Sequence, residues 1–405
     1  MKLTGNALVA AMCFGQIGNL LPHVVVPAVM PQHLMPLWNL SAAEAGLMAS
    51  SFAFGYMVAV PILTTLTDRV DARRILAAGS TLSGLATIGF GLFATGLQTA
   101  VLWWTLAGIG FAGAYMPGLK ALTDRLGEKD SSRSVTLYTS SFSFGVGFSF
   151  LVAQLAADSL GWRWAFVITG LGPVLMLPAC AGMEPKRPVP SKTKLLDFRP
   201  VFRNRPALGY ILGYGVHCFE LYGMRTWIVA FWTYVTAHHG GASPLSALAM
   251  SVLVSMMAFP ASVIGNEFAL RFGRHRAITI IMVVSAGTAI LIGLAAGASP
   301  WILIALLAVY SFSVPADSGA LTSGMTASAV PGQVGATMAL HSTVGFGLSA
   351  LGAWGMGVAI DSAGGPNFER AWLAGFSLLA AATLIGPLVL WWSRKDEARV
   401  VRSGR

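Results

Sequence analysis

The feature that most constrains the fold is a succession of long apolar runs that contain almost no charge. Residues 47–66, LMASSFAFGYMVAVPILTTL, form one such run without a charged side chain. A helix needs about 20 mostly apolar residues to cross a bilayer. Only 10% of the 405 residues are charged, against about 25% in typical soluble proteins. The sequence therefore predicts an all-α protein that crosses a membrane many times.

Twelve such runs can be placed along the chain, and we expect 12 transmembrane helices embedded in a lipid bilayer. The predicted spans are 6–30, 43–66, 74–96, 100–123, 134–157, 164–182, 208–234, 246–269, 276–297, 300–323, 334–359 and 369–392. Because the number is even, both termini should lie on the same side of the membrane.

Basic residues fix the expected orientation, because cytoplasmic loops of membrane proteins are enriched in Lys and Arg. With a cytoplasmic N-terminus, 22 of the 26 Lys and Arg residues fall in the predicted inner segments. This distribution accounts for the net charge of +10 without a nucleic-acid partner. We expect a multi-pass protein of the cell (inner) membrane with both termini in the cytoplasm.

The chain divides once, at the polar stretch MEPKRPVPSKTKLLDFRPVFRNRP. This predicts a six-helix bundle in residues 1–182, a cytoplasmic linker in 183–206, a second six-helix bundle in 207–393 and a cytoplasmic tail in 394–405. The two bundles repeat each other: GVGFS at 145–149 and GFGLS at 345–349 occupy equivalent predicted spans. The two stretches lie 200 positions apart. A match between equivalent spans at this spacing indicates two pseudo-symmetric halves.

The loop between the second and third predicted spans reads TLTDRVDARR. It resembles the loop motif G-x-x-x-D-R-x-G-R-R of the major facilitator superfamily, with Thr64 and Asp71 at its glycine positions and Ala72 at a basic one. A second copy, LRFGRHR at 270–276, lies at the equivalent place in the second half and has Leu270 where the motif has Asp. The resemblance covers the whole chain and implies that family's fold of two six-helix bundles.

The resemblance also implies secondary transport, and it implies that this loop acts as a charge latch between cytoplasmic helix ends. The residues that would form the cytoplasmic gate are Asp68, Arg69, Arg73, Arg74, Asp124, Arg271 and Arg274. Asp68 with Arg73 or Arg74 is the expected pair. The alternative is that these are ordinary cytoplasmic positive charges.

Ionisable and polar residues inside spans are costly and usually face a cavity or a partner. In the first span, Gln16, Asn19 and His23 share one helical stripe. They line a substrate cavity or make hydrogen bonds between helices. Tyr115 in the fourth span is a further candidate cavity residue.

The seventh span contains GYGVHCFELYGMRTW, with His217, Glu220 and Arg225. Three interpretations remain open: a structural ion pair of Glu220 with Arg225 or with another helix, a substrate site in which Arg225 and His217 bind an anion, and a proton site at Glu220 and His217. Asp317 in the tenth span is a candidate for proton coupling, and His341 in the eleventh is a candidate for substrate binding. Each could equally be a structural group.

The function that we expect is proton-coupled symport of a small, anionic, carboxylate-like solute by alternating access. One alternative is an exporter or facilitator of a neutral or cationic compound, and another is a non-transporting membrane sensor or scaffold. The sequence has no nucleophile–base pattern, nucleotide motif or metal-ligand spacing, and its three cysteines lie in apolar runs. We therefore expect no enzymatic activity, no cofactor and no metal, and a monomer.

Overall fold

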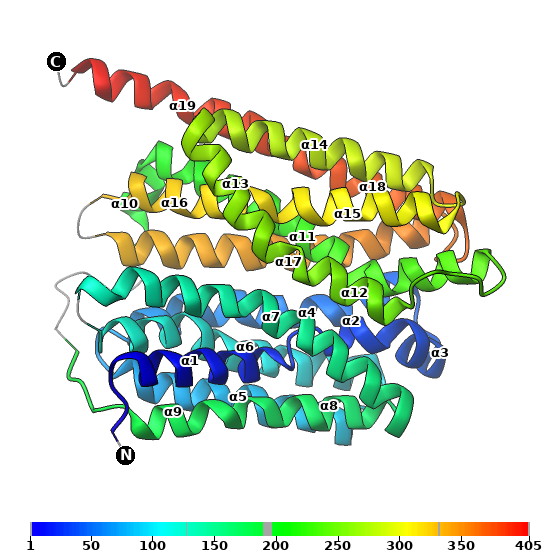
Figure 1. Ribbon diagram of the computed structural model, residues 1–405, viewed down its shortest axis with the longest axis horizontal. Helices are drawn as coiled ribbons and strands as arrows, with labels where there is room; N and C mark the ends of the chain where they lie inside the picture. Colours follow the sequence, from blue (N-terminus) through cyan, green and yellow to red (C-terminus); the bar gives the residue numbers. More distant parts are fainter. Residues whose placement is uncertain (1, 127, 189–196, 331–332, 404–405) are drawn as a thin grey trace. The chain divides into compact units, whose positions relative to one another are not determined.

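The computed structural model describes residues 2–126, 128–188, 197–330 and 333–403. Within these ranges the secondary structure consists of helices without strands (Figure 1). The predicted all-α class is therefore confirmed. The middle of the predicted linker, 189–196, lies outside the described residues.

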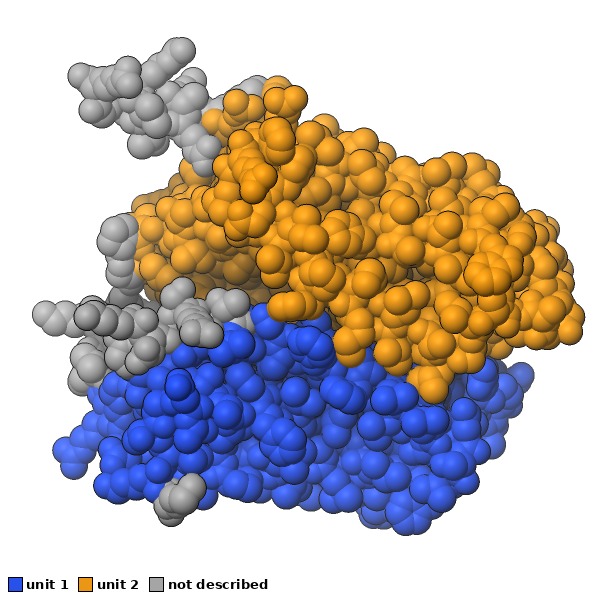
Figure 2. Space-filling model, in the orientation of Figure 1, with its two compact units in different colours: residues 1–40, 47–195 blue, residues 41–46, 196–405 orange. Residues whose placement is uncertain are grey.

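The chain forms two compact helical units (Figure 2). Unit 1 comprises Met1–Leu40 and Leu47–Leu195, and unit 2 comprises Ser41–Gly46 and Leu196–Arg405. Unit 1 contains α1 (Gly5–Leu20), α2 (Val25–Val29), the π-helix η1 (Met30–Leu34), α3 (Met35–Trp38), most of α4 (Ala42–Leu66), α5 (Ala72–Phe93), α6 (Leu97–Thr123), α7 (Glu128–Leu160), α8 (Trp162–Leu171), the 3₁₀ helix η2 (Gly172–Leu175) and α9 (Met176–Gly182).

The main part of unit 2 begins within the predicted linker 183–206, because the helices α10 and α11 start before residue 206. It contains α10 (Arg199–Arg203), α11 (Arg205–His238), α12 (Ala247–Met256), α13 (Ala258–Phe272), α14 (Arg274–Leu294), α15 (Pro300–Ala316), α16 (Ser318–Ser328), α17 (Val334–Ser362), α18 (Glu369–Thr383) and α19 (Ile385–Ser403). The last helix continues beyond residue 393, where the sequence predicts the end of the second bundle.

Among the described residues, ten helical segments are long and apolar enough to cross a membrane, and a bent pair at the N-terminus would make eleven. Helix α11, at 34 residues, is long enough to span, but it carries Glu220 and Arg225 and is not one of these segments. The predicted number of twelve thus depends on counting α11. Large apolar side chains cover the helix surfaces, as expected for contact with lipid: Leu85, Leu294, Trp301 and Leu388 are each more than 60% exposed.

The first predicted span, 6–30, is not one continuous helix. Helix α1 ends at Leu20, and the segment Val25–Trp38 leaves it at an angle of 46°. Pro22 lies in the turn between them, and its carbonyl accepts a hydrogen bond from the backbone N–H of Val25. Because proline lacks an N–H, it interrupts the ladder of hydrogen bonds in a helix. The bend follows the polar stripe of α1 directly.

Glycine allows close helix contact in unit 1. A methyl group on Gly110 of α6 would collide with the backbone of Ser83 and Gly79 in α5. Small residues of this kind let membrane helices approach closely and pack by van der Waals contact. The helices α5 and α6 are therefore in close contact, and both contact α1, which carries the predicted polar stripe.

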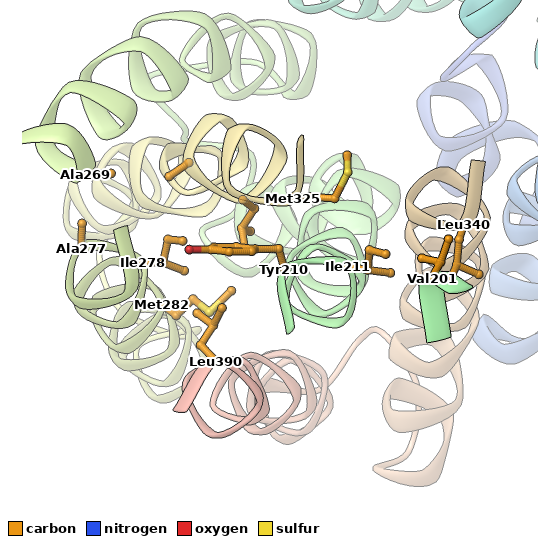
Figure 3. Packing of buried hydrophobic residues seen from close by; sticks show 12 residues of the cluster. Val201, Tyr210, Ile211, Ala269, Ala277, Ile278, Met282, Met325, Leu340 and Leu390 are labelled. Atoms are coloured by element: carbon orange, nitrogen blue, oxygen red, sulfur yellow. The ribbon is translucent and has the colours of Figure 1, made fainter. Parts of the chain in front are cut away.

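In unit 2, buried side chains from six helices and from α10 form a cluster on two sides of α11: Ile278, Met282 and Leu390 lie near Tyr210, whereas Val201 and Leu340 lie beside Ile211 (Figure 3). The cluster consists of Val201, Tyr210, Ile211, Ala269, Ala277, Ile278, Met282, Ala320, Leu321, Met325, Leu340 and Leu390. It fixes the first turns of α11, and with them the direction in which the polar residues farther along α11 point.

Candidate functional site

Helix α11 carries the three ionisable residues that interrupt an apolar run. Asn204 starts the helix, because its side chain accepts a hydrogen bond from the backbone N–H of Ala207. His217, Glu220 and Arg225 are only 2%, 2% and 6% exposed. Ionisable groups are costly to bury unless they are paired or hydrogen-bonded. Their partners therefore decide what this part of unit 2 can do.

His217 pairs with Asp317. The imidazole Nδ1 lies 2.6 Å from the Oδ1 atom of Asp317, and both side chains are almost fully buried. Asp317 is positioned by an interruption between α15 and α16, just after Pro315. The structure thus brings together two candidate residues that are 100 positions apart in the sequence. A contact of this kind can hold and release a proton between the two groups.

Glu220 lies one helical turn from His217 and has a different partner. Its Oε1 atom accepts a hydrogen bond of 2.8 Å from the hydroxyl of Ser285 in α14. Ser285 is not predictable as this partner, because nothing near it in the sequence distinguishes it from the other serines in apolar runs. Glu220 is thus held by a neutral donor, which can serve both the protonated and the ionised carboxyl.

Arg225 has no acidic partner among the described side chains. Its guanidinium carbon lies 5.2 Å from the centre of the Tyr222 ring, and its Nη1 atom lacks a hydrogen-bond partner in the described part of the chain. The structural ion pair between Glu220 and Arg225, one of the three interpretations of this segment, is not formed. A buried guanidinium over an aromatic face retains several donors in a planar fork.

His341 of α17 lies beside this group through an aromatic contact. Its ring stacks on Tyr214 with a centroid distance of 3.8 Å, and Tyr214 also lies 5.6 Å from the ring of His217. Tyr214 therefore links the two histidines. The sequence offered a signal for Tyr214, since it lies three residues before His217 on the same helical face.

In unit 1, the predicted polar stripe of α1 is buried. Gln16 and Asn19 are 0% and 1% exposed. The hydroxyl of Tyr138 in α7 donates a hydrogen bond of 2.8 Å to Oε1 of Gln16. The amide Nε2 of Gln16, and both Oδ1 and Nδ2 of Asn19, have no hydrogen-bond partner among the described residues. Helix–helix hydrogen bonding therefore accounts for only one of the four amide atoms.

His23 follows the end of α1 and is surrounded by aromatic rings. The ring centres of Phe52, Phe111 and Phe142 lie between 5.2 and 5.3 Å from its own. Tyr115 extends this group, because it stacks on Phe111 at 6.0 Å and meets Phe142 edge to face at 5.3 Å. The structure thus brings His23 and Tyr115 into one aromatic group.

The loop after α4 forms a charge cluster in which Asp71 is the central acid. One guanidinium nitrogen of Arg125 lies 2.8 and 2.9 Å from the two carboxylate oxygens of Asp71. The backbone N–H groups of Arg73 and Lys186 also donate to this carboxylate. Burial alone would raise the pKa of Asp71, but these hydrogen bonds outweigh it and hold the pKa below its ordinary value.

The expected pairing of Asp68 with Arg73 or Arg74 is not among the ion pairs of the described side chains. Arg73 instead lies 3.8 Å from Asp71 and donates to the backbone carbonyl of Met183. Asp124 lies 3.2 Å from Lys120, one turn earlier on the same helix. For the remaining gate candidates, Arg69, Arg271 and Arg274, the described structure has no ion pair.

Two features, membrane-spanning helices and a few buried ionisable residues within them, define a multi-pass membrane protein with a polar interior. Residues 12–353 match the Major Facilitator Superfamily, and the chain belongs to this family of membrane transporters. Family and fold are those of transporters rather than of enzymes.

Curated relatives are similar over part of the chain. The human protein "Protein spinster homolog 1" is 25% identical over 239 residues, which cover 55% of this chain and 45% of the relative. "Benzoate transport protein" of Acinetobacter baylyi is 29% identical over 161 residues, covering 38% of this chain and 34% of the relative. "Probable sphingolipid transporter spinster homolog 1" of Arabidopsis thaliana is 27% identical over 134 residues, covering 33% and 27%. The matches thus span less than half the length of these relatives.

Solved structures match the whole fold. A bacterial homologue of the human lysosomal transporter Spinster, in an inward-facing and unoccupied conformation, superposes with a TM-score of 0.72 at 17% identity, covering 95% of this chain and 94% of that one. Its inward-facing and occupied form gives a TM-score of 0.70 at 17% identity and covers 97% and 96%. At this identity the likeness establishes the fold alone.

Proposed function

We propose that the protein is a secondary transporter that moves a small organic anion, with a carboxylate-like group, by alternating access. The observation that carries this proposal is the buried guanidinium of Arg225, which lacks an acidic partner among the described side chains. A buried charge without a counter-charge is costly, and guanidinium binds carboxylates through two parallel hydrogen bonds. In the proposed function the substrate supplies the counter-charge.

Proton coupling is the second part of the proposal. His217 and Asp317 are in contact at 2.6 Å, and Glu220 lies one turn away, where it accepts a hydrogen bond from the Ser285 hydroxyl. These three groups can exchange protons without leaving a full charge unpaired, because each has a polar neighbour. Symport follows if protonation of this group and binding of the anion at Arg225 favour the same conformation.

The names of the relatives support two different substrates. The Acinetobacter baylyi relative is named for transport of benzoate, a carboxylate, in agreement with the role proposed for Arg225. The Arabidopsis thaliana relative is named as a probable sphingolipid transporter. This keeps a second candidate function, export or facilitated movement of a neutral or cationic amphiphile, with Glu220 as its charge partner.

We further propose that the protein is a monomer of the inner membrane with cytoplasmic termini. The orientation is supported by the concentration of 22 of 26 basic residues in the predicted inner segments. In a background without native cysteines, cysteines at positions 191 and 243 should react with impermeant thiol reagents from opposite sides of the membrane. Position 191 lies outside the described residues. Reaction of both from outside would contradict the orientation.

The substrate class is tested by ligand-induced thermal stabilisation of the purified protein. At a concentration of about 100 times Kd, a ligand raises the stability by about 2.7 kcal/mol. Short carboxylates should raise Tm, whereas the matching neutral amides and primary amines should not. The shift should vanish in Arg225→Gln and persist in Arg394→Gln, a control at an exposed arginine. Stabilisation by amines and not by acids would favour the second candidate.

A further inference from the structure

Unit 1 contains buried side-chain amide atoms that have no hydrogen-bond partner among the described residues. Gln16 Nε2, Asn19 Nδ2 and Asn19 Oδ1 are inaccessible and lack a partner among the described residues. A buried polar atom without a hydrogen bond costs about 1–3 kcal/mol, and most such atoms in proteins are satisfied. These two neighbouring residues therefore offer two donors and one acceptor to something other than the fold.

The two amides lie on the same face of α1. They are three residues apart, the spacing that aligns side chains on a helix. The Tyr138 hydroxyl holds the amide of Gln16 through its oxygen, which leaves the Nε2 group as a donor of fixed orientation. This arrangement is more specific than a general polar surface, because the donor and acceptor atoms are assigned.

Aromatic rings accompany this stripe at both ends. Tyr138, at the Gln16 end, stacks with Tyr115 at 6.4 Å. At the other end, His23 meets Phe52, Phe111 and Phe142. Tyr115 connects the two ends, since it contacts Phe111 and Phe142 as well as Tyr138. Gln16 is thus joined through Tyr138 to a continuous aromatic group drawn from α4, α6 and α7, and Asn19 lies one turn from Gln16 on the same face of α1.

We infer that unit 1 recognises a planar aromatic ring that carries hydrogen-bonding substituents, so that the transported solute is an aromatic compound. Flat rings pack on aromatic side chains in stacked or edge-to-face geometry, with a gain beyond that of equal apolar area. The amides of Gln16 and Asn19 donate to substituent oxygens, and Asn19 Oδ1 accepts from a hydroxyl. The inference deepens the proposed function, on which it rests: together they specify an aromatic acid.

The experiment compares rings with and without aromatic character in the full-length protein. Benzoate and cyclohexanecarboxylate carry the same charged group, and phenol and cyclohexanol are the neutral pair. Dissociation constants are obtained from the concentration dependence of Tm for each compound. We expect each aromatic member to bind about tenfold more tightly than its saturated counterpart, as a gain of about 1.4 kcal/mol implies.

Variants assign the preference to this group of residues. Asn19→Ala should abolish any advantage of hydroxybenzoates over benzoate, and Phe111→Leu should reduce the preference for the aromatic member of each pair. The control is Phe93→Leu, in which a ring that is 61% exposed is removed from the neighbouring helix α5. The ligand comparison on the unaltered protein decides the question even where a variant fails to fold.

The possible outcomes separate this inference from the proposed function. Equal binding of benzoate and cyclohexanecarboxylate would overturn the aromatic inference and leave anion transport standing. Binding of phenol without binding of either acid would support aromatic recognition and contradict the anionic substrate. If neither benzoate, the hydroxybenzoates nor phenol raises Tm, the inference is wrong, and short aliphatic acids then decide the proposed function by themselves.

Discussion

Glu220 and Arg225 share one helix, yet each has a different kind of neighbour. Glu220 accepts a hydrogen bond from a serine hydroxyl, whereas Arg225 lies over a tyrosine ring and forms no ion pair within the described part of the chain. Their opposite charges and their separation of five positions in the sequence suggest an ion pair between them. Five positions turn an ideal helix by about 500°, so the two side chains point about 140° apart. The helix geometry therefore separates them, and their roles can be separated by mutation.

The first prediction concerns Glu220→Gln. The amide keeps the shape of the side chain and its contact with Ser285 but cannot take up or release a proton. We expect exchange of labelled substrate across proteoliposomes to continue, while accumulation driven by a pH gradient is lost. Ser285→Ala serves as the comparison, because it removes the hydrogen bond and keeps the carboxyl. Normal pH-driven accumulation in Glu220→Gln would exclude this residue from coupling.

Sequence patterns locate the helix ends, but they do not predict the partners of the residues there or the angles between helices. The motif resemblance pointed to Asp68 in this loop, but Asp71, which occupies a glycine position of the motif, makes the described ion pair. Its partner Arg125 is 54 residues away. In the same way the prolines near residue 22 signal a break, but they do not give its angle of 46°. Long-range partners and angles depend on packing that local sequence does not encode.

The second prediction concerns the stability of the loop cluster. Asp71→Asn removes a charge pair whose side chains are 7% and 9% exposed, and breaking such a pair costs about 3 kcal/mol. Because the folded-state pKa of Asp71 is lowered from 3.8, the stabilisation is complete at higher pH and is lost as pH falls below about 3.8. Thermal unfolding should therefore show a large difference between the proteins at pH 7 that shrinks toward pH 3.

Asp68→Asn is the matched control for this experiment. Both substitutions remove one acidic charge from the same loop, but among the described side chains only the Asp71 carboxylate accepts hydrogen bonds from Arg125 and Lys186. A loss of stability in Asp68→Asn equal to that in Asp71→Asn would show that charge balance, and not this hydrogen-bonded cluster, stabilises the loop.

The third prediction tests the close contact between α5 and α6. Gly110→Ala places a methyl group against the backbone of Ser83, and overpacking of this kind typically costs about 1–3 kcal/mol. Gly287→Ala in α14 is the control, because no atom lies within 4 Å of the added methyl group, and alanine favours a helix over glycine by about 1 kcal/mol. Thermal unfolding should give opposite signs for the two variants; equal effects would contradict the packing argument.

At the scale of the whole molecule, the long apolar runs and the repeat predicted most of the fold. The all-α class and the family follow from local composition and from motifs that recur at a fixed offset, and both are confirmed. Helix α11 shows the limit of this reasoning, because it contains the buried candidate residues His217, Glu220 and Arg225 and is not one of the helices that composition marks as spanning. The candidate residues could be named from sequence, whereas partners such as Ser285 and Tyr138 required three-dimensional structure.

The central claim is that a proton gradient drives an organic anion through a protein that binds it at Arg225. It is tested most directly by the uptake of labelled benzoate into proteoliposomes with an imposed pH gradient, after subtraction of the passive uptake by protein-free vesicles. The account predicts accumulation that requires the gradient in the unaltered protein and that is absent in Arg225→Gln, while Arg394→Gln behaves as the unaltered protein does. Equal gradient-driven uptake by the unaltered protein and by Arg225→Gln would contradict the account.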